Sequence, residues 1–303
     1  MNRLWPRCCA LIAAAWLSAC SVAPTQPSSS SPPASTAAPT REKTADLKIG
    51  LALGGGGNRG FAHIGVLKVL DDAGISADIV VGTSAGSAVG ALYAGGLSGQ
   101  DIERLSLPLQ REAVLTWVVP RMGFASGEPM ETYINQRVGK RLIEQLNRSF
   151  GAVATDLQTG RAVVFQRGNT GQAVRASCAV PGLFQPVRIG DRLYADGGLV
   201  QPIPVSSARK MGANFVIAVD VSTKPAHNTV DSVTNIMLQT FDIMGESINR
   251  YERQQADVVI QPDIQSISVT DLSDKSRAIA LGEAAARAAL PDLLQALERA
   301  RAR

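Results

Sequence analysis

Histidine and cysteine are scarce in this chain of 303 residues. The sequence holds two histidines, His63 and His227, and four cysteines, of which only Cys178 lies beyond the first 20 residues. A lone cysteine cannot form an intramolecular disulfide, so a disulfide-stapled fold is excluded for that part of the chain. The sequence also shows no cluster with metal-ligand spacing, and we expect neither a metal nor a cofactor.

A strong excess of charge is missing as well. The formal charge is +4, and loss of Arg3 and Arg7 with an N-terminal leader would lower it by two. A nearly balanced surface gives no argument for a nucleic-acid partner. The apolar run Cys8–Leu17 is about half the ~20 residues that a bilayer-spanning helix needs, so it has the length of a signal-peptide core.

The leader carries a second signal at its end. The run Leu17-Ser18-Ala19-Cys20 resembles the lipobox of bacterial lipoproteins. The resemblance implies that residues 1–19 are a lipoprotein signal peptide and that Cys20 is acylated. Because Ser21, and not Asp, follows, it also implies a membrane-anchored protein at the periplasmic face of the outer membrane. An ordinary signal peptide with an incidental Cys20 is the alternative.

The chain then changes in composition twice. Ser21–Thr44 is rich in Pro, Ser, Thr and Ala and has no apolar periodicity, so it cannot bury enough surface to offset its ordering entropy. We expect residues 20–46 to form the lipidated cysteine and a disordered linker. Residues 47–303 are long enough to bury one large core, and we expect them to form a single globular domain.

The start of that domain alternates strands and helices. Buried strands are expected at Lys48–Leu53 and Ile79–Val81, and helices at Arg59–Ala73 and from the second strand to Ala94. This order predicts a mainly parallel sheet in a three-layer α/β/α fold. Further elements are expected at Pro129–Leu146 (helix), Phe150–Leu157 with Arg161–Gln166 (hairpin), Asn214–Val221 (strand), Val230–Gln255 (helix), Asp257–Gln261 (strand) and Ser276 to the end (helix).

A glycine-rich turn separates the first strand from the first helix. It reads Gly55-Gly56-Gly57-Asn58-Arg59-Gly60. Glycines let backbone amides face an anion, and a helix N-terminus adds positive potential. The motif alone fits either a dinucleotide-binding loop or the oxyanion hole of an acyl-transfer enzyme. Asp78 has roughly the offset of a ribose-binding acid, but it begins the second strand and does not end it.

The second strand ends in Gly82-Thr83-Ser84-Ala85-Gly86. A Gly-x-Ser-x-Gly run at a strand-to-helix turn is typical of a nucleophile elbow, which projects the serine above the sheet edge. Neighbouring parallel strands would bring this turn beside the glycine-rich one. Close helix–sheet packing would also explain the glycines, but it does not require a serine. The sequence therefore favours acyl-transfer chemistry at Ser84.

Residue types alone do not identify the base that would activate Ser84. His63 lies on the first helix beside apolar residues and favours a structural role. His227 lies in a polar connection, although the order Ser84, Asp196, His227 mimics that of α/β-hydrolases. Asp196, taken alone, also fits a simple turn before two glycines.

Three motifs in this order resemble the signatures of patatin-like phospholipases: Gly55–Gly60, Gly82–Gly86 and Asp196-Gly197-Gly198. Arg175–Phe184 and Ala154–Leu157 resemble the family too, whereas Gln201 stands where the family pattern has Asn. The resemblance implies a lipid acyl-ester hydrolase with a Ser84–Asp196 dyad, no histidine base, and an oxyanion hole formed by amides of Gly56, Gly57 and Asn58.

Several readings stay open at this stage. A non-catalytic phosphate- or dinucleotide-binding lipoprotein would use the same glycine loop, and an acyltransferase or thioesterase would use the same dyad. Arg59 fits a loop-orienting residue, a ligand for a phosphate head group or a solvated charge. The segment Leu115–Phe124 is apolar enough for a lid or acyl channel, and core packing explains it equally well.

Overall fold

The computed structural model describes residues 46–109, 116–117, 125–224, 231–269 and 272–302. The expected signal peptide (1–19) and the expected linker (20–46), apart from its last residue, lie outside these ranges, as do Cys20, His227 and most of the apolar segment Leu115–Phe124. Within the described ranges, no helix combines the length and the apolar character that crossing a bilayer requires.

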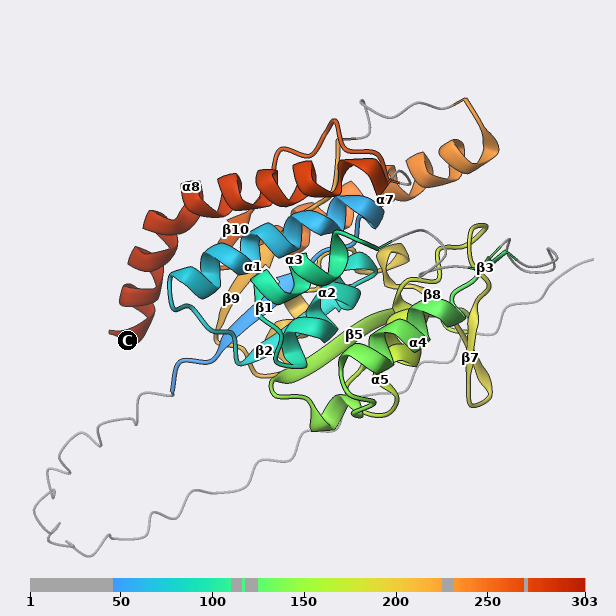
Figure 1. The fold of residues 1–303 in the computed structure, drawn as a ribbon, viewed down its shortest axis with the longest axis horizontal. Helices are drawn as coiled ribbons and strands as arrows, with labels where there is room; N and C mark the ends of the chain where they lie inside the picture. Colours follow the sequence, from blue (N-terminus) through green and yellow to red (C-terminus); the bar gives the residue numbers. More distant parts are fainter. Residues whose placement is uncertain (1–45, 110–115, 118–124, 225–230, 270–271, 303) are drawn as a thin grey trace, which may run out of the picture. The chain divides into compact units, whose positions relative to one another are not determined.

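The fold is built on an eight-stranded sheet with the strand order β10–β9–β1–β2–β5–β8–β7, and β6 pairs with β5 off this path (Figure 1). The strands are β1 (Ile49–Leu53), β2 (Ile79–Thr83), β5 (Ser149–Asp156), β6 (Arg161–Phe165), β7 (Val187–Ile189), β8 (Arg192–Asp196), β9 (Phe215–Val219) and β10 (Val258–Ile260). The pairings from β10 to β5 are parallel, and those involving β6, β7 and β8 are antiparallel. A separate short ladder joins β3 (Thr116–Trp117) and β4 (Ala125–Ser126).

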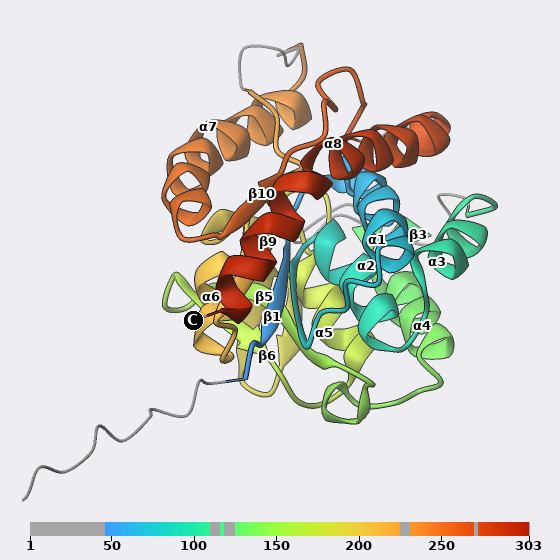
Figure 2. The ribbon, with the colours of Figure 1, turned by 90° about the vertical axis from the view of Figure 1, so that its left-hand side faces the viewer.

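Helices cover both faces of the sheet. Figure 2 shows α1 and α2 on one side and α6 on the other. The helices are α1 (Ala62–Asp72), α2 (Ala85–Ala94), α3 (Gly99–Ser106), α4 (Glu128–Arg137), α5 (Thr170–Ser177), α6 (Val205–Lys210), α7 (Val233–Gln254) and α8 (Lys275–Arg301). Short 3₁₀ turns are η1 (Gly57–Phe61), η3 (Ile143–Gln145), η4 (Gly197–Leu199) and η6 (Leu272–Asp274). The three-layer α/β/α prediction is confirmed.

The central strands form because their sequences are apolar without interruption. All five residues of β1, of β2 and of β9 are buried. A strand covered by helices on both faces loses the alternation that a half-exposed strand shows. Leu51 and Leu53 of β1 join the larger core under α1 and α2, and Ala52 joins a second core against α6.

The predicted helix Pro129–Leu146 is wrong in its second half. The structure ends α4 at Arg137 and follows it with the separate turn η3. Gly139 adopts a φ of 69°, its amide donates to the Gln136 carbonyl over 3.2 Å, and the Lys140 amide donates to the Asn135 carbonyl over 2.6 Å. This is the Schellman arrangement, which closes a helix at a left-handed glycine.

Candidate active site

Ser84 occupies the sharp corner between β2 and α2. Its backbone has a φ of 52° and a ψ of −125°, a conformation that costs a non-glycine residue about 1–3 kcal/mol. The flanking glycines are required sterically, because a Cβ at Gly82 would overlap the Gly86 carbonyl and one at Gly86 would overlap the Leu53 carbonyl. The corner therefore has the backbone form of a nucleophile elbow.

The backbone amide of Ser84 is held by a residue that the sequence did not single out. Ser177, at the end of α5, accepts this amide's hydrogen bond on its Oγ over 2.9 Å. The same hydroxyl donates to the Val153 carbonyl of β5 over 2.5 Å. Ser177 is fully buried. It lies within the stretch Arg175–Phe184 that resembles the family, and no local signal distinguishes its role from that of a packed small residue.

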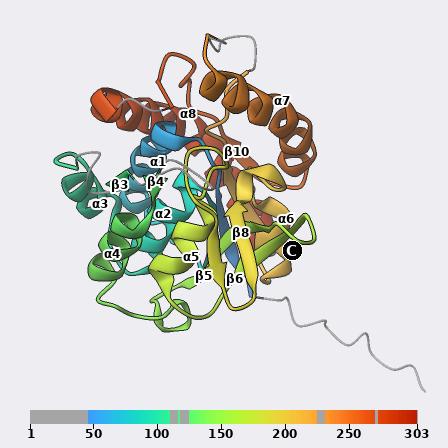
Figure 3. The same cartoon turned by 90° about the vertical axis from the view of Figure 1, so that its right-hand side faces the viewer.

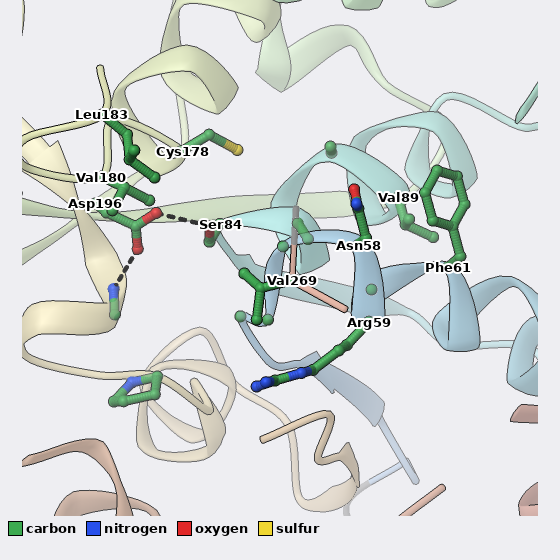
Figure 4. Close-up of a pocket in the computed structure, with 18 of the residues that line it drawn as sticks. Asn58, Arg59, Phe61, Ser84, Val89, Cys178, Val180, Leu183, Asp196 and Val269 are labelled. Atoms are coloured by element: carbon green, nitrogen blue, oxygen red, sulfur yellow. Dashed lines mark hydrogen bonds between the residues drawn. The ribbon is translucent and has the colours of Figure 1, made fainter. Parts of the chain in front are cut away.

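Asp196 faces the serine hydroxyl. Ser84 Oγ donates to Asp196 Oδ2 over 2.6 Å, and the Gly198 amide donates to Oδ1 over 2.7 Å (Figure 4). The Asp196 amide donates to the Ala179 carbonyl, and Thr155 Oγ1 donates to the Asp196 carbonyl. Hydrogen bonds of the Asp196 backbone to Ala179 and Thr155 therefore fix the position of this residue, and the Gly198 amide orients its carboxylate.

The meeting of these two residues, 112 positions apart, follows from strand pairing. Val153 of β5 pairs with Thr83 of β2, and the next residue, Ala154, pairs with Asp196 of β8. Val153 and Ala154 both pair with β6 along one edge of β5. Along the other edge, β5 pairs first with β2 and then with β8, so these two strands lie end to end. Figure 3 shows β5, β6 and β8 side by side. Because β8 is antiparallel to β5, its final residue points back toward the end of β2.

Burial changes the chemistry of the Asp196 carboxyl. Desolvation raises its pKa to about 6, against the opposing effect of the hydrogen bonds from Ser84 and the Gly198 amide. A carboxylate with this pKa accepts a proton more readily than an ordinary aspartate, whose pKa is about 3.9. The environment therefore makes Asp196 a stronger base than its residue type suggests.

The glycine loop packs directly against the elbow. A Cβ at Gly55 would lie 3.2 Å from the Ser84 Cβ, and one at Gly60 would lie 2.5 Å from the Ala85 Cβ. The Gly55 amide donates to the Pro202 carbonyl, and the Asn58 amide donates to the Val269 carbonyl over 3.0 Å. Among the described residues, the Gly56 and Gly57 amides have no acceptor. The loop beside Ser84 therefore contains two amides without an acceptor among the described residues, and the expected third donor, Asn58, is already engaged.

Arg59 is buried and is not a solvated charge. Its Nε donates to the Ile267 carbonyl over 3.3 Å, and its guanidinium lies 3.6 Å from the Asp242 carboxylate of α7. Burial lowers the pKa of Arg59, and Asp242 opposes that shift. The side chain thus fastens the glycine loop to α7 and to the segment before α8.

Both the elbow and the loop line a pocket of about 640 Å³, a size typical of small-ligand sites (Figure 4). Ser84 and Asp196 contribute polar atoms to it. Most of the remaining wall is apolar and comes from α2, α3, α4 and α7, through Val89, Leu92, Ile102, Met130, Tyr133, Ile134, Leu238 and Phe241. Within the described residues, no group of three or more His, Cys, Asp or Glu side chains is arranged to hold a metal.

Of the other candidate residues, His63 and Asp78 lie outside the pocket and Cys178 lines it. His63 Nε2 donates to the Gly54 carbonyl over 2.8 Å, and this fully buried ring supports the start of the glycine loop. Asp78 accepts the Ile49 amide where β1 begins, at the opposite strand end from the glycine loop, so it cannot serve as a ribose-binding acid there. Cys178 is buried, and desolvation raises its pKa to about 12.

Gln201, where the family pattern has Asn, belongs to a buried network. Its backbone carbonyl accepts Thr83 Oγ1 over 2.8 Å, next to the elbow. Its side chain bonds Ser206, Ser207 and Glu252, the last of which lies on α7. Gln201 therefore joins the segment after Asp196 to α7. Its presence in place of the family's Asn leaves the Ser84–Asp196 contact intact.

Comparisons with known proteins indicate the family. A sequence model described as a patatin-like phospholipase matches residues 51–209. An uncharacterized NTE-family protein of Mycobacterium tuberculosis is 30% identical over 287 residues, which cover 84% of this chain and 48% of that protein. The lysophospholipase NTE1 of Pyricularia oryzae is 34% identical over 181 residues, which cover 58% of this chain and 12% of the relative. The chain thus spans about half the length of its mycobacterial relative.

A solved structure supports the fold. VipD from Legionella pneumophila superposes with a TM-score of 0.50 at 12% sequence identity, over 81% of this chain and 67% of that one. At this identity the similarity concerns the fold alone. The family match covers all three motifs, from the glycine loop through Asp196-Gly197-Gly198. The chain belongs to the patatin-like phospholipase family.

Proposed function

We propose that this protein is a serine hydrolase of lipid acyl esters, of the phospholipase A or lysophospholipase type. The observation that carries the proposal is the 2.6 Å hydrogen bond from Ser84 Oγ to Asp196 Oδ2, made inside a largely apolar pocket. An acyl chain fits such a wall, and a strained serine next to a buried carboxylate fits a nucleophile with its base.

The first half of the reaction forms an acyl-enzyme. Ser84 Oγ attacks the ester carbonyl carbon while its proton passes to Asp196 Oδ2, and the carbonyl oxygen becomes an oxyanion. Collapse of the tetrahedral intermediate breaks the bond to the alcohol, which leaves with the proton from Asp196. In the second half, water gives a proton to Asp196 and attacks the acyl carbon. Collapse of this second tetrahedral intermediate breaks the bond to Ser84 Oγ, which takes the proton back from Asp196, and the fatty acid is released.

The amides of Gly56 and Gly57 are the proposed oxyanion donors. They are free of acceptors among the described residues, and their loop packs against the elbow. Ser84 also caps α2, whose positive end favours negative charge at this corner. Donors fixed before the reaction stabilise the developing charge without reorganisation, and loss of one such donor costs about 10²–10³ in rate in other enzymes.

The test is covalent labelling combined with turnover. A fluorophosphonate probe should label the protein, and Ser84→Ala should abolish both labelling and p-nitrophenyl ester hydrolysis. Asp196→Asn should remove turnover. Ser106→Ala is a matched control, because Ser106 also lines the pocket but donates to the Glu103 carbonyl. Unchanged labelling of Ser84→Ala would reject the nucleophile, and an inactive His227→Ala would restore a triad.

Product analysis decides between hydrolase and acyltransferase. With a mixed bacterial lipid extract, a hydrolase releases free fatty acid whether or not an added alcohol is present. An acyltransferase would instead place most of the acyl chain on that alcohol. A binding module for nucleotides would show neither product, and it would gain thermal stability when a nucleotide is added.

We also propose that Cys20 is acylated and anchors the protein at the periplasmic face of the outer membrane. The support is the lipobox-like run that ends at this residue and the Pro/Ser-rich stretch that follows it. Metabolic labelling with an alkyne fatty acid should mark the protein in the membrane fraction. Cys20→Ser should lose both the label and the membrane association.

A further inference from the structure

Helix α7 has one side that lines the pocket and an outward side that is apolar. One face lines the pocket through Leu238, Phe241, Asp242, Gly245 and Asn249, which recur at the three- and four-residue spacing of a single helix side. A surface helix normally buries one such stripe and turns a charged side to solvent. The outward side of α7 differs, because large apolar side chains are exposed on it.

The outward side of α7 is rich in large apolar residues. Val233 is 76% exposed and Tyr251 67% exposed, and Ile236, Ile243 and Met244 are each more than half exposed. These five are a majority of the large apolar residues exposed in the described part of the chain. Their spacing places them on one side of the helix, roughly opposite the pocket-lining residues. Figures 1 and 3 show α7 along the outside of the molecule.

The outward side of α7 also carries few charges. Besides the five apolar residues, the exposed positions of α7 with a described side chain are Thr240, Ser247, Arg250 and Gln254. None is acidic, and one is basic. Helix α8 of the same domain shows the ordinary pattern, since six of its exposed residues are charged and Leu294 alone is large and apolar. The apolar side is therefore a property of α7 and not of the domain's surface in general.

We propose that the outward face of α7, defined as Val233, Ile236, Ile243, Met244 and Tyr251, docks onto a lipid surface that contains anionic phospholipid. Apolar side chains accompanied by a basic residue and no carboxylate match the chemistry of an interfacial helix. The inference deepens the proposed function. A helix is about 10 Å across, so a membrane bound on one side of α7 lies next to the pocket on the other.

Partition onto vesicles tests the docking face without relying on catalysis. The full chain carrying Cys20→Ser and Ser84→Ala is floated with phosphatidylethanolamine–phosphatidylglycerol vesicles, so neither acylation nor hydrolysis contributes. The α7 variant adds Ile236→Ser, Ile243→Ser and Met244→Ser. The matched control adds Ala284→Ser, Ala288→Ser and Leu294→Ser on α8. We expect the α7 variant to lose at least about tenfold in partition relative to the control.

A charge pair at one position provides a second readout. Ile243→Glu should weaken partition onto these vesicles more than Ile243→Lys, because only the glutamate is repelled by anionic lipid. With Ser84 intact, the triple α7 variant should keep its kcat/KM on a water-soluble short-chain ester and lose at least about tenfold on vesicle phospholipid.

Two results would overturn the inference. One is equal partition of the α7 and α8 variants. The other is a chain that sediments as a dimer, which the α7 substitutions dissociate with no change in partition, because this would assign the face to a second copy. Absence of hydrolysis by the chain with Ser84 intact would reject the proposed function and leave the partition result standing.

Discussion

The Oγ of Ser177 accepts a hydrogen bond from the backbone amide of Ser84 over 2.9 Å, so the corner that carries the proposed nucleophile is anchored from α5. A buried amide that loses its acceptor costs about 1–3 kcal/mol, and here the amide belongs to a residue already held at a φ of 52°. The geometry of Ser84 therefore depends on a hydroxyl that takes no direct part in the proposed reaction.

Ser177→Ala is expected to lower the free energy of unfolding by about 1–3 kcal/mol and kcat/KM by about tenfold. Thr170→Val is the matched control: Thr170 is the other end residue of α5, and its buried hydroxyl donates to the Arg141 carbonyl. Urea unfolding and ester hydrolysis measure the two effects. If both variants lose equal stability and neither loses activity, Ser177 has only a structural role.

The pH dependence of activity should report Asp196. Its carboxyl must be ionised to accept the Ser84 proton, and its pKa is raised to about 6 by burial. We expect kcat/KM to fall about tenfold per unit below pH 6 and to reach a plateau above it. The profile of His227→Gln should be the same. An acid limb near pH 4, or one that moves in the histidine variant, would contradict Asp196 as the base.

The strain at Ser84 predicts an unusual order of stabilities. Its φ and ψ suit glycine far better than alanine, and both replacements remove the hydroxyl. Relief of about 1–3 kcal/mol of strain exceeds the roughly 0.4–1 kcal/mol by which glycine stabilises the unfolded chain. Ser84→Gly should therefore be more stable to urea than Ser84→Ala by about 1 kcal/mol. An alanine variant of equal or greater stability would show that the corner is unstrained.

Acid should destabilise the domain through His63. Desolvation lowers its pKa to about 4, below the unfolded value of 6.5. The unfolded chain therefore binds more protons between these values, and the stability contributed by the neutral buried ring is present above pH 6.5 and lost as the pH falls toward 4. The loss should be about 3 kcal/mol by pH 4.

His63→Gln isolates this effect. A glutamine amide can donate to the Gly54 carbonyl as the imidazole does, but it gains no proton. Urea unfolding across the pH range should show a smaller acid loss for the variant than for the unsubstituted chain. Identical slopes for the two proteins would exclude His63 as a source of acid sensitivity.

Local patterns predicted most of the fold. Uninterrupted apolar runs indicated β1, β2 and β9, and the structure has strands there. The predicted helix Pro129–Leu146 was too long, although the segment contains its own stop signal in Gly139. These features depend on neighbours within a few residues, so a sequence can specify them.

The elbow was also predictable, because Gly82 and Gly86 are needed wherever a strand turns this sharply around a serine. The sequence alone thus determined which serine stands at a strained corner and which glycine turn lies beside it. The carboxylate that meets the serine was another matter. Asp196 was assigned only through a family resemblance, since an aspartate before two glycines fits a turn equally well.

Tertiary structure decided the rest through strand register. Consecutive residues of β5, Val153 and Ala154, pair with Thr83 and Asp196, and this brings two distant strand ends together. Pairing between segments far apart in the chain depends on the packing of the whole sheet, which no local pattern encodes. This packing buries Asp196, and the burial raises its pKa to about 6. The packing also brings Ser177 Oγ within hydrogen-bond distance of the Ser84 amide.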